Sequence, residues 1–256
     1  FRSARRLDCV GLIARGVDGL GVLYHLLAGY DATDPRSRRR RVEPELPDWE
    51  PGKLRVGVLG DLRAWGTTDG VADVFARALD ALTHELPNRR NVDFADFSIP
   101  AARRAGLFLV EAEMLGAYPA DVLAAASPRL QKMLDYARGK SAADFAAADR
   151  VVDAAVLKTR RLFADIDVLV TLTTPQTAFA HGTAAPVDQA DFTAFANLSG
   201  CPALSLPMGP TADGLPAGLQ LMGPPGSDLR LLELAEVCAA ALDATPDYPV
   251  GRFDEA

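Results

Sequence analysis

The sequence is poor in cysteine and histidine, the residues from which disulfide frameworks, zinc sites and thiol or imidazole catalysts are built. In 256 residues it has three of each, widely spaced: Cys9, Cys201, Cys238, His25, His84 and His181. An odd number of distant cysteines predicts reduced thiols in a cytoplasmic protein. These residues nowhere show the spacing of metal ligands, so we expect no metal and no other cofactor.

Long apolar runs and a basic charge balance are missing as well. No apolar run is long enough to span a bilayer and no signal peptide precedes the first element, so we expect no membrane partner. The formal net charge of −7 argues against nucleic-acid binding, which needs a basic surface. With 49% hydrophobic and 24% charged residues, the composition is that of an ordinary globular chain with a sizeable core.

Two signals of nucleotide binding fail when their full motifs are checked. The stretch VGVLGD at 56–61 lacks the G-x-G-x-x-G of a dinucleotide loop. The tripeptide GKS at 139–141 suggests a phosphate loop, but Leu134 stands where that motif requires glycine. Ser141 is better explained as the N-cap of a helix, with Asp144 as its capping acid.

The spacing of apolar residues predicts an α/β chain. Helices are expected at about 17–27, 70–85, 102–115, 142–163 and from 228, and strands at 53–60, 91–98 and 168–172. Two further apolar runs, at 203–206 and 217–222, surround a turn-rich spacer and predict a buried hairpin.

Two regions of the chain are not predicted to form a single helix or strand. Residues 53–98 form either a βαβ unit or a hairpin-like excursion from the sheet. Residues 36–51 combine a basic run with acidic and proline-rich positions, which predicts a solvated linker-like loop.

The hairpin region carries the most specific pattern of the chain. The sequences FANLSGCPALSLPMG and DGLPAGLQLMG resemble the C-terminal part of the amidase signature family, which places small, hydroxyl and proline residues in the same order. The matching positions are Asn197, Ser199, Gly200, Pro202, Ala203, Ser205, Pro207, Gly214, Leu215, Pro216, Gly218 and Gln220.

A second match lies near the start of the chain. The family's L-D-x-x-G segment and the following A-G-x-D-x-x-D-P are present as Leu7, Asp8, Gly11, Ala14, Arg15, Ala28, Gly29, Asp31, Asp34 and Pro35. The chain departs from the family at Leu12 and Leu172, where family members usually have proline. The resemblance implies that 1–256 is the C-terminal portion of one amidase-type domain, an α/β/α sandwich around a mixed β-sheet.

The resemblance also implies the chemistry, which is hydrolysis of an amide C–N bond in a small-molecule substrate. Family members use a lysine that relays through one serine to a nucleophilic serine, in a segment that precedes the L-D-x-x-G motif. None of Lys53, Lys132, Lys140 and Lys158 matches that lysine, so no catalytic residue is assigned to this chain. Because it begins at Phe1 without methionine, we expect the reactive groups from the upstream half of the same enzyme or from a companion chain. A homo-oligomer is also expected.

The resemblance assigns substrate-binding positions on the acyl side of the cleft. They are Thr173, Thr174, Pro175, Phe192, Thr193, Phe195 and Asn197. Each has a simpler explanation, since phenylalanines are more often core residues and an asparagine is more often a turn cap. Cys201 follows Gly200, but without a histidine nearby in the sequence it is better explained as a small buried thiol.

A catalytically inactive amidase-like protein, which binds a partner or acts as a scaffold subunit, is the alternative function. The departures at Leu12 and Leu172 favour it slightly. Labelling of the intact assembly by a fluorophosphonate probe separates the two functions.

We predict that the isolated chain of 1–256 is poorly soluble, because a half-domain exposes apolar surface where the remaining strands dock. Size-exclusion chromatography with light scattering and a thermal melt test this expectation. A monodisperse monomer that melts cooperatively would contradict it.

Overall fold

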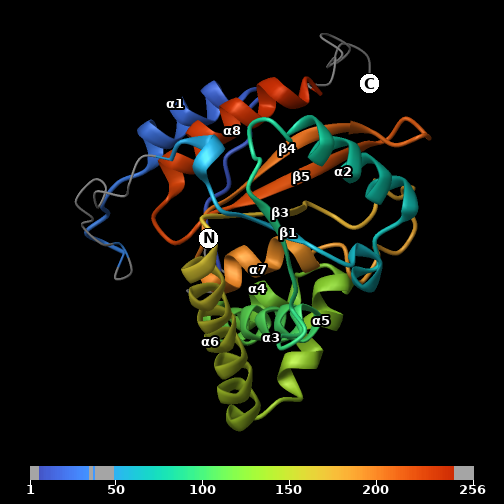
Figure 1. Cartoon of the computed structure of the whole chain (residues 1–256). Coiled ribbons are helices and arrows are strands. Elements are labelled where there is room, and N and C mark those ends of the chain that lie inside the picture. The colour runs from blue at the N-terminus through green and yellow to red at the C-terminus, as the bar shows by residue number, and fades with distance from the viewer. Residues whose placement is uncertain (1–5, 35–36, 38–48, 245–256) are drawn as a thin grey trace, which may run out of the picture.

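The structure, a computed structural model, describes residues 6–34, 37 and 49–244, and its centre is a mixed five-stranded sheet (Figure 1). The strand order is β2-β1-β3-β5-β4. Strands β2, β1 and β3 are parallel to one another, whereas β5 is antiparallel to β3 and β4 is antiparallel to β5. The strands are β1 (Val56–Leu59), β2 (Arg89–Val92), β3 (Val168–Leu172), β4 (Ala203–Pro210) and β5 (Pro216–Met222).

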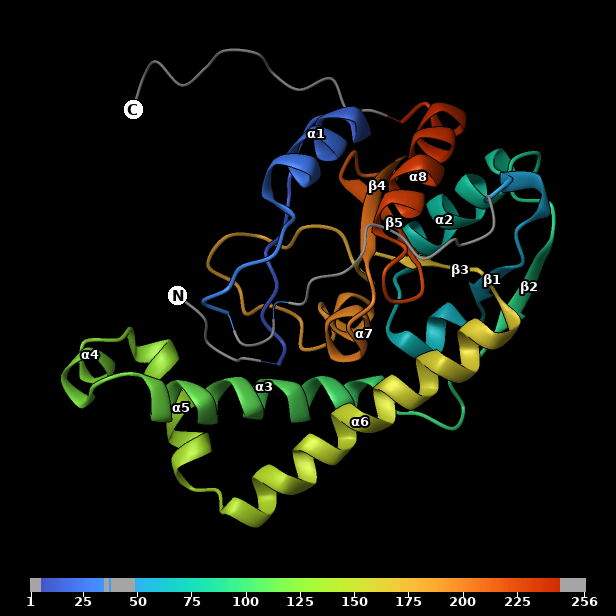
Figure 2. The same ribbon diagram turned by 90° about the vertical axis from the view of Figure 1, so that its left-hand side faces the viewer.

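Helices cover both faces of the sheet, so the predicted α/β/α sandwich is confirmed. Helices α1, α2 and α8 lie on one face, and α3, α6 and α7 lie on the other (Figures 1 and 2). The helices are α1 (Val17–Leu27), α2 (Asp69–Ala81), α3 (Ile99–Ala117), α4 (Ala120–Ala124), α5 (Pro128–Arg138), α6 (Ala142–Asp165), α7 (Asp191–Ser199) and α8 (Asp228–Leu242).

Local capping chemistry explains where several helices begin and end. Ser141 and Asp144 form the predicted capping box at the start of α6, each side chain accepting a hydrogen bond from the backbone N–H of the other residue. The Ser98 and Ser127 side chains cap α3 and α5, each directly before the helix. Helix α7 ends at Gly200, whose φ of +68° favours glycine.

The prediction of a strand at 91–98 was wrong beyond Val92. The chain turns at Asp93, whose carboxylate accepts the N–H of Ala95 at 3.1 Å, and the N–H of Phe97 bonds to the carbonyl of Phe94 at 2.8 Å. The alternation therefore reflects side-chain packing rather than strand pairing. Since α2 lies between the parallel strands β1 and β2, this region is a βαβ unit. Most of the predicted linker at 36–51 lies outside the described residues.

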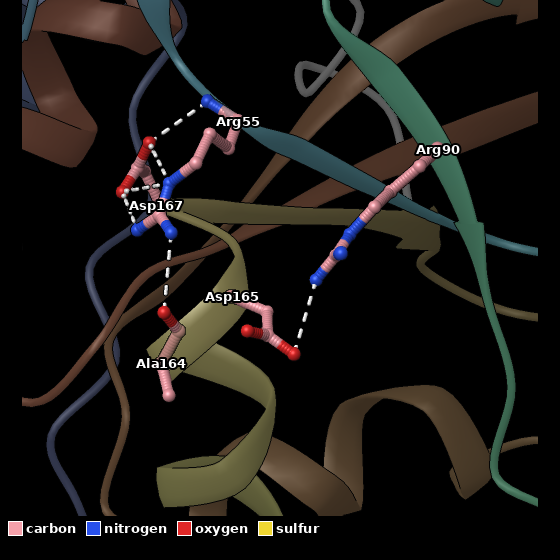
Figure 3. A network of polar contacts seen from close by, with 5 residues as sticks. All are labelled: Arg55, Arg90, Ala164, Asp165 and Asp167. Atoms are coloured by element: carbon pink, nitrogen blue, oxygen red, sulfur yellow. Dashed lines mark hydrogen bonds and ion pairs between the residues drawn. The ribbon is translucent and has the colours of Figure 1, made fainter.

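A polar clamp joins β1 to β3 at the point where both strands start (Figure 3). The N–H of Asp167 donates to the Arg55 carbonyl, and the N–H of Arg55 donates to the Asp167 carboxylate, both at 2.8 Å. The Arg55 guanidinium adds a 2.7 Å ion pair to the same carboxylate and a 3.1 Å bond to the carbonyl of Ala164 at the end of α6. The clamp therefore sets β1, β3 and α6 relative to one another.

The two faces of β3, β5 and β4 differ in chemistry because side chains alternate along a strand. One face is leucine-rich, and Leu172, Leu219 and Leu221 on it are fully buried. The opposite face carries a set of residues that we call the polar row, brought together across the strands by the register of the sheet. The polar row consists of Thr171, Thr173, Ser205, Gly218 and Gln220.

We predict that Asp167→Asn lowers the melting temperature at pH 7 by about 2–4 °C, because the variant loses the ion pair to Arg55. Partial burial alone would raise the pKa of Asp167, but the hydrogen bonds from Arg55 outweigh it and lower that pKa. The stabilising effect is therefore complete above the unfolded-state pKa of about 3.9 and is lost as pH falls through the folded-state pKa. Melting curves of both proteins between pH 7 and pH 2.5 measure it; a constant difference would contradict it.

We also predict that Gly218→Ala destabilises the sheet by about 1–3 kcal/mol. A Cβ at this position would lie 2.8 Å from Thr173 Oγ1 and 2.9 Å from Ser205 Oγ, so both hydroxyls would have to move. Gly116→Ala is the matched control, because nothing lies within 4 Å of the added carbon and the change raises helix propensity. Urea unfolding measures both variants, and equal stability of the two would contradict the prediction.

Candidate functional site

The polar row is held together by hydrogen bonds between its own members. Thr173 Oγ1 and Ser205 Oγ lie 2.6 Å apart, and the N–H of Thr173 donates to the carbonyl of Gly218 at 2.8 Å. The buried Gln220 donates from Nε2 to Thr171 Oγ1 at 3.0 Å. Thr173 is half-buried and Ser205 is exposed, so the outer end of the row is accessible to a ligand.

Helix α7 covers the inner end of the polar row. Gln220 Nε2 makes a second bond, of 3.3 Å, to the carbonyl of Phe192 on α7. The Phe192 and Phe195 residues, 3% and 2% exposed, belong to an aromatic cluster with Trp65 and Phe94. These two rings are core residues in the described chain, and what α7 presents to the polar row is a backbone carbonyl.

Asn197 and Thr193 serve the structure of α7 in different ways. Asn197 Nδ2 donates to the carbonyl of Leu7 at 3.2 Å and to Cys9 Sγ at 3.1 Å, so it ties the helix to the start of the described chain. Thr193 Oγ1 donates to the carbonyl of Ala190 at 3.3 Å, in the first turn. Neither contact was expected from the sequence.

The segment after β3 leads from the outer end of the row into a loop that is tied down at two points. The carbonyl of Pro175, which is buried, accepts the N–H of Thr68 at 3.0 Å, and Thr174 Oγ1 donates to the carbonyl of Gln176 at 2.8 Å. Leu172 is paired with Leu219 inside the sheet, so its replacement of the usual proline is compatible with a regular strand end.

An ion pair with little exposure fixes α7 against α3. The Arg103 guanidinium donates to the Asp191 carboxylate, with side-chain exposures of 18% and 4%. Removal of either partner would leave a charge with little access to water, so the pair is costly to break. It therefore fixes the position of α7 over the inner end of the polar row. No sequence pattern distinguishes Asp191 from an ordinary loop carboxylate.

The two buried thiols, Cys201 and Cys238, are unsuited to nucleophilic catalysis. Burial raises the pKa of Cys201, and burial together with the nearby Glu85 raises the pKa of Cys238 to about 12. All three cysteines are free, as expected. In the described ranges no group of three or more His, Cys, Asp or Glu side chains is arranged to hold a metal ion.

Three of the four lysines have partners of their own away from the polar row. Lys53 pairs with Glu50, and Lys158 pairs with Asp96. Lys140 lies 4.8 Å from the centre of a tyrosine ring, and Lys132 lines a cavity beside α5. Among the residues that the structure describes, no lysine bonds to a hydroxyl of the row, so the row by itself lacks a base.

Two surface cavities lie at other places on the molecule and are lined by none of the predicted site residues. One lies between α3 and α5, and the other lies between β2, with the turn after it, and α6. The structure thus places Thr173 in an accessible polar row and adds Thr171, Ser205 and Gln220 to it. Thr171 stands two residues before Thr173, and Ser205 and Gln220 are among the positions that match the family pattern, so these were the sequence signals for the additions.

Comparison with known proteins gives a consistent result. Residues 2–232 match the family described as Amidase. Two curated relatives, from Methylocella silvestris and Azorhizobium caulinodans, are each a subunit of glutamyl-tRNA(Gln) amidotransferase and are 29% and 30% identical to this chain. The alignments cover 93% and 95% of this chain but 55% and 56% of those proteins. The chain therefore spans about half the length of the curated relatives it matches.

Solved structures share the fold at lower identity. Allophanate hydrolase from Kluyveromyces lactis superposes with a TM-score of 0.77 at 23% identity, over 94% of this chain and 40% of that one. The corresponding glutamyl-tRNA(Gln) amidotransferase protein from Thermotoga maritima gives 0.74 at 22% identity, over 91% and 52%. With the family match extending over nearly all of its residues and its fold shared with these enzymes, the chain belongs to the Amidase family.

Proposed function

We propose that this chain is part of an enzyme that hydrolyses an amide C–N bond, and that the nucleophile and base are supplied by residues outside it. The observation that carries the proposal is the Amidase match over 2–232 in a chain whose polar row has no base of its own among the described residues. Amide hydrolysis needs an activated nucleophile, donors for the oxyanion and a proton for the leaving amine.

The polar row is suited to support such chemistry but not to perform it. The Ser205 hydroxyl is bonded to Thr173 and has no lysine or histidine contact within the described chain, so nothing there activates it. In the proposal, Thr173, Thr174 and Pro175 form one wall of the cleft. The buried rings of Phe192 and Phe195 position α7, while Thr193 and Asn197 stabilise that helix and its contact with the start of the chain.

Exposed apolar side chains near α1 support completion by a further segment or chain. They occur within twenty residues, on α1 and the stretch before it, with exposures from 61% to 94%: Val10, Ile13, Val22, Leu26 and Leu27. Covering such a patch would stabilise the assembly by roughly 25 cal/mol for each Å² buried. We propose the upstream half of the amidase domain or a companion chain as the covering partner, in an assembly that forms a homo-oligomer in the cytoplasm.

The substrate proposed is a small-molecule amide. The relatives include a subunit of glutamyl-tRNA(Gln) amidotransferase, and the structural neighbours include an allophanate hydrolase and a 6-aminohexanoate cyclic dimer hydrolase. Because the first of these proteins is a subunit, a companion chain fits the same pattern.

No helix in the described part of the chain has both the length and the apolar character needed to cross a bilayer.

We predict that a fluorophosphonate probe labels the complete protein on a serine that lies outside residues 1–256. The physical reason is that the probe reacts with activated serines, and the described row contains none. Peptide mass spectrometry locates the adduct. An adduct on a serine of this chain would contradict the proposed division of the site. A folded, complete assembly without labelling or amide turnover would support the alternative of an inactive scaffold.

Ser205→Ala provides the matched test within this chain. We expect labelling to persist, with a loss of about 1 kcal/mol of stability from the missing Thr173 bond. Ser127→Ala is the control, because that serine also makes one hydrogen bond but caps α5, away from the row, and its loss costs about as much. Abolished labelling in a folded Ser205→Ala protein, with labelling kept in the control and an adduct mapped to Ser205 in the unaltered protein, would show that Ser205 is itself the nucleophile and would overturn the proposal.

A further inference from the structure

A cavity of about 300 Å³ lies between helices α3 and α5, apart from the polar row. Figure 2 shows these two helices side by side below the sheet. Four apolar or aromatic side chains and four charged ones line the cavity: Leu107, Phe108, Met133, Tyr136, Arg104, Glu111, Arg129 and Lys132. The volume is enough for a small organic molecule.

The cationic side chains of this cavity are not neutralised by the described part of the chain. Arg104, Arg129 and Lys132 make no ion pair with a described residue, although one carboxylate lines the same cavity. Three cations and one carboxylate leave the cavity with an excess of positive charge. Such an arrangement favours an anion, and the two guanidinium groups suit the paired oxygens of a carboxylate.

The second cavity shows what a structural charge cluster looks like in this protein. It is lined by residues of β2, the following turn and α6, and there Lys158 pairs with Asp96 and Arg90 pairs with Asp165 at 3.5 Å (Figure 3). Its opposite charges neutralise one another without a ligand. The cavity between α3 and α5 differs because, within the described residues, its cations have no such partners.

Glu111 is the group in the cavity that most strongly indicates a ligand. The residue is 4% exposed, and its Oε2 is buried without a hydrogen-bond partner among the described residues. Burial raises the pKa of this carboxyl group. An unsatisfied buried acceptor destabilises the fold unless a donor meets it. Because Oε2 is closed to solvent, a ligand N–H can meet it only if the Glu111 side chain turns towards the cavity on binding.

The apolar and aromatic side chains of the cavity determine which shape of ligand fits. Phe108 and Tyr136 pack edge to face with ring centres 6.1 Å apart, and Leu107 and Met133 complete an apolar surface. A planar or aliphatic body would bury its apolar area here. We propose that this cavity binds a small organic carboxylate that carries an N–H donor next to an apolar body, with the carboxylate at the cations and the N–H at Glu111.

The test uses N-benzoylglycine as the probe and isothermal titration calorimetry on the complete protein. We expect binding that weakens about tenfold for N-benzoylglycinamide, which lacks the charge, and about tenfold for O-benzoylglycolate, which has an ester oxygen in place of the N–H. Equal affinity for all three compounds, or no binding of N-benzoylglycine, would overturn the proposal. Binding is measured whether or not the protein hydrolyses amides, so failure of the proposed function leaves this result unaffected.

Variants separate a binding role from a structural one. Lys132→Met is expected to weaken N-benzoylglycine binding about tenfold, whereas Lys53→Met, at an exposed surface pair, leaves it unchanged. Glu111→Leu is expected to raise the melting temperature by removing an unsatisfied buried acid and, at the same time, to abolish the preference for N–H over ester oxygen. Unchanged selectivity in a folded Glu111→Leu protein would overturn the assigned role of Glu111.

Discussion

The two-residue period of β3, β5 and β4 is the constraint on which the site depends. Along each strand the residues of the polar row alternate with apolar residues of the opposite face, so the core and the polar row are fixed by one register. A shift of one residue would place Thr171 and Gln220 among leucines and turn Leu219 and Leu221 towards the polar side. A shifted register would bury polar groups without hydrogen-bond partners. The free-energy cost of that burial disfavours any register other than the observed one.

The surrounding elements hold that register in place from both ends. The Arg55–Asp167 clamp sets the start of β3 against β1, and the bond from Gln220 to the carbonyl of Phe192 sets α7 over the row. The ion pair between Arg103 and Asp191 then fixes α7 against α3. These contacts connect segments that are far apart in the sequence, and together they make a rigid support that contains no activated nucleophile among the described residues.

Much of the fold could be predicted from sequence because its signals are local. The capping residues Ser141 and Asp144 fix the start of α6, and the turn formers between 203–206 and 217–222 indicate the hairpin. The predicted strand at 91–98 was wrong beyond its first residues because Phe94 and Phe97 both pack against Phe195, a long-range cause that local spacing does not reveal.

The candidate site was harder to predict from the sequence, again because long-range packing determines it. A motif placed Thr173 and Phe195 in one group, but only the three-dimensional packing separates an accessible hydroxyl from a buried ring. Glu111 likewise lies within an apolar stretch of α3, and its unsatisfied oxygen is visible only once α5 is in place. Pairings between distant elements, not residue types, decide which side chains are available.

The polar row, in our proposal, walls a reaction cleft whose reactive serine comes from elsewhere. A crystal structure of the complete protein with a phosphonate bound to that serine tests this claim most directly. We predict that the adduct is in contact, within about 4 Å, with Thr173 or Ser205. An adduct beside the leucine face of the sheet, or remote from β3 and β4, would contradict it.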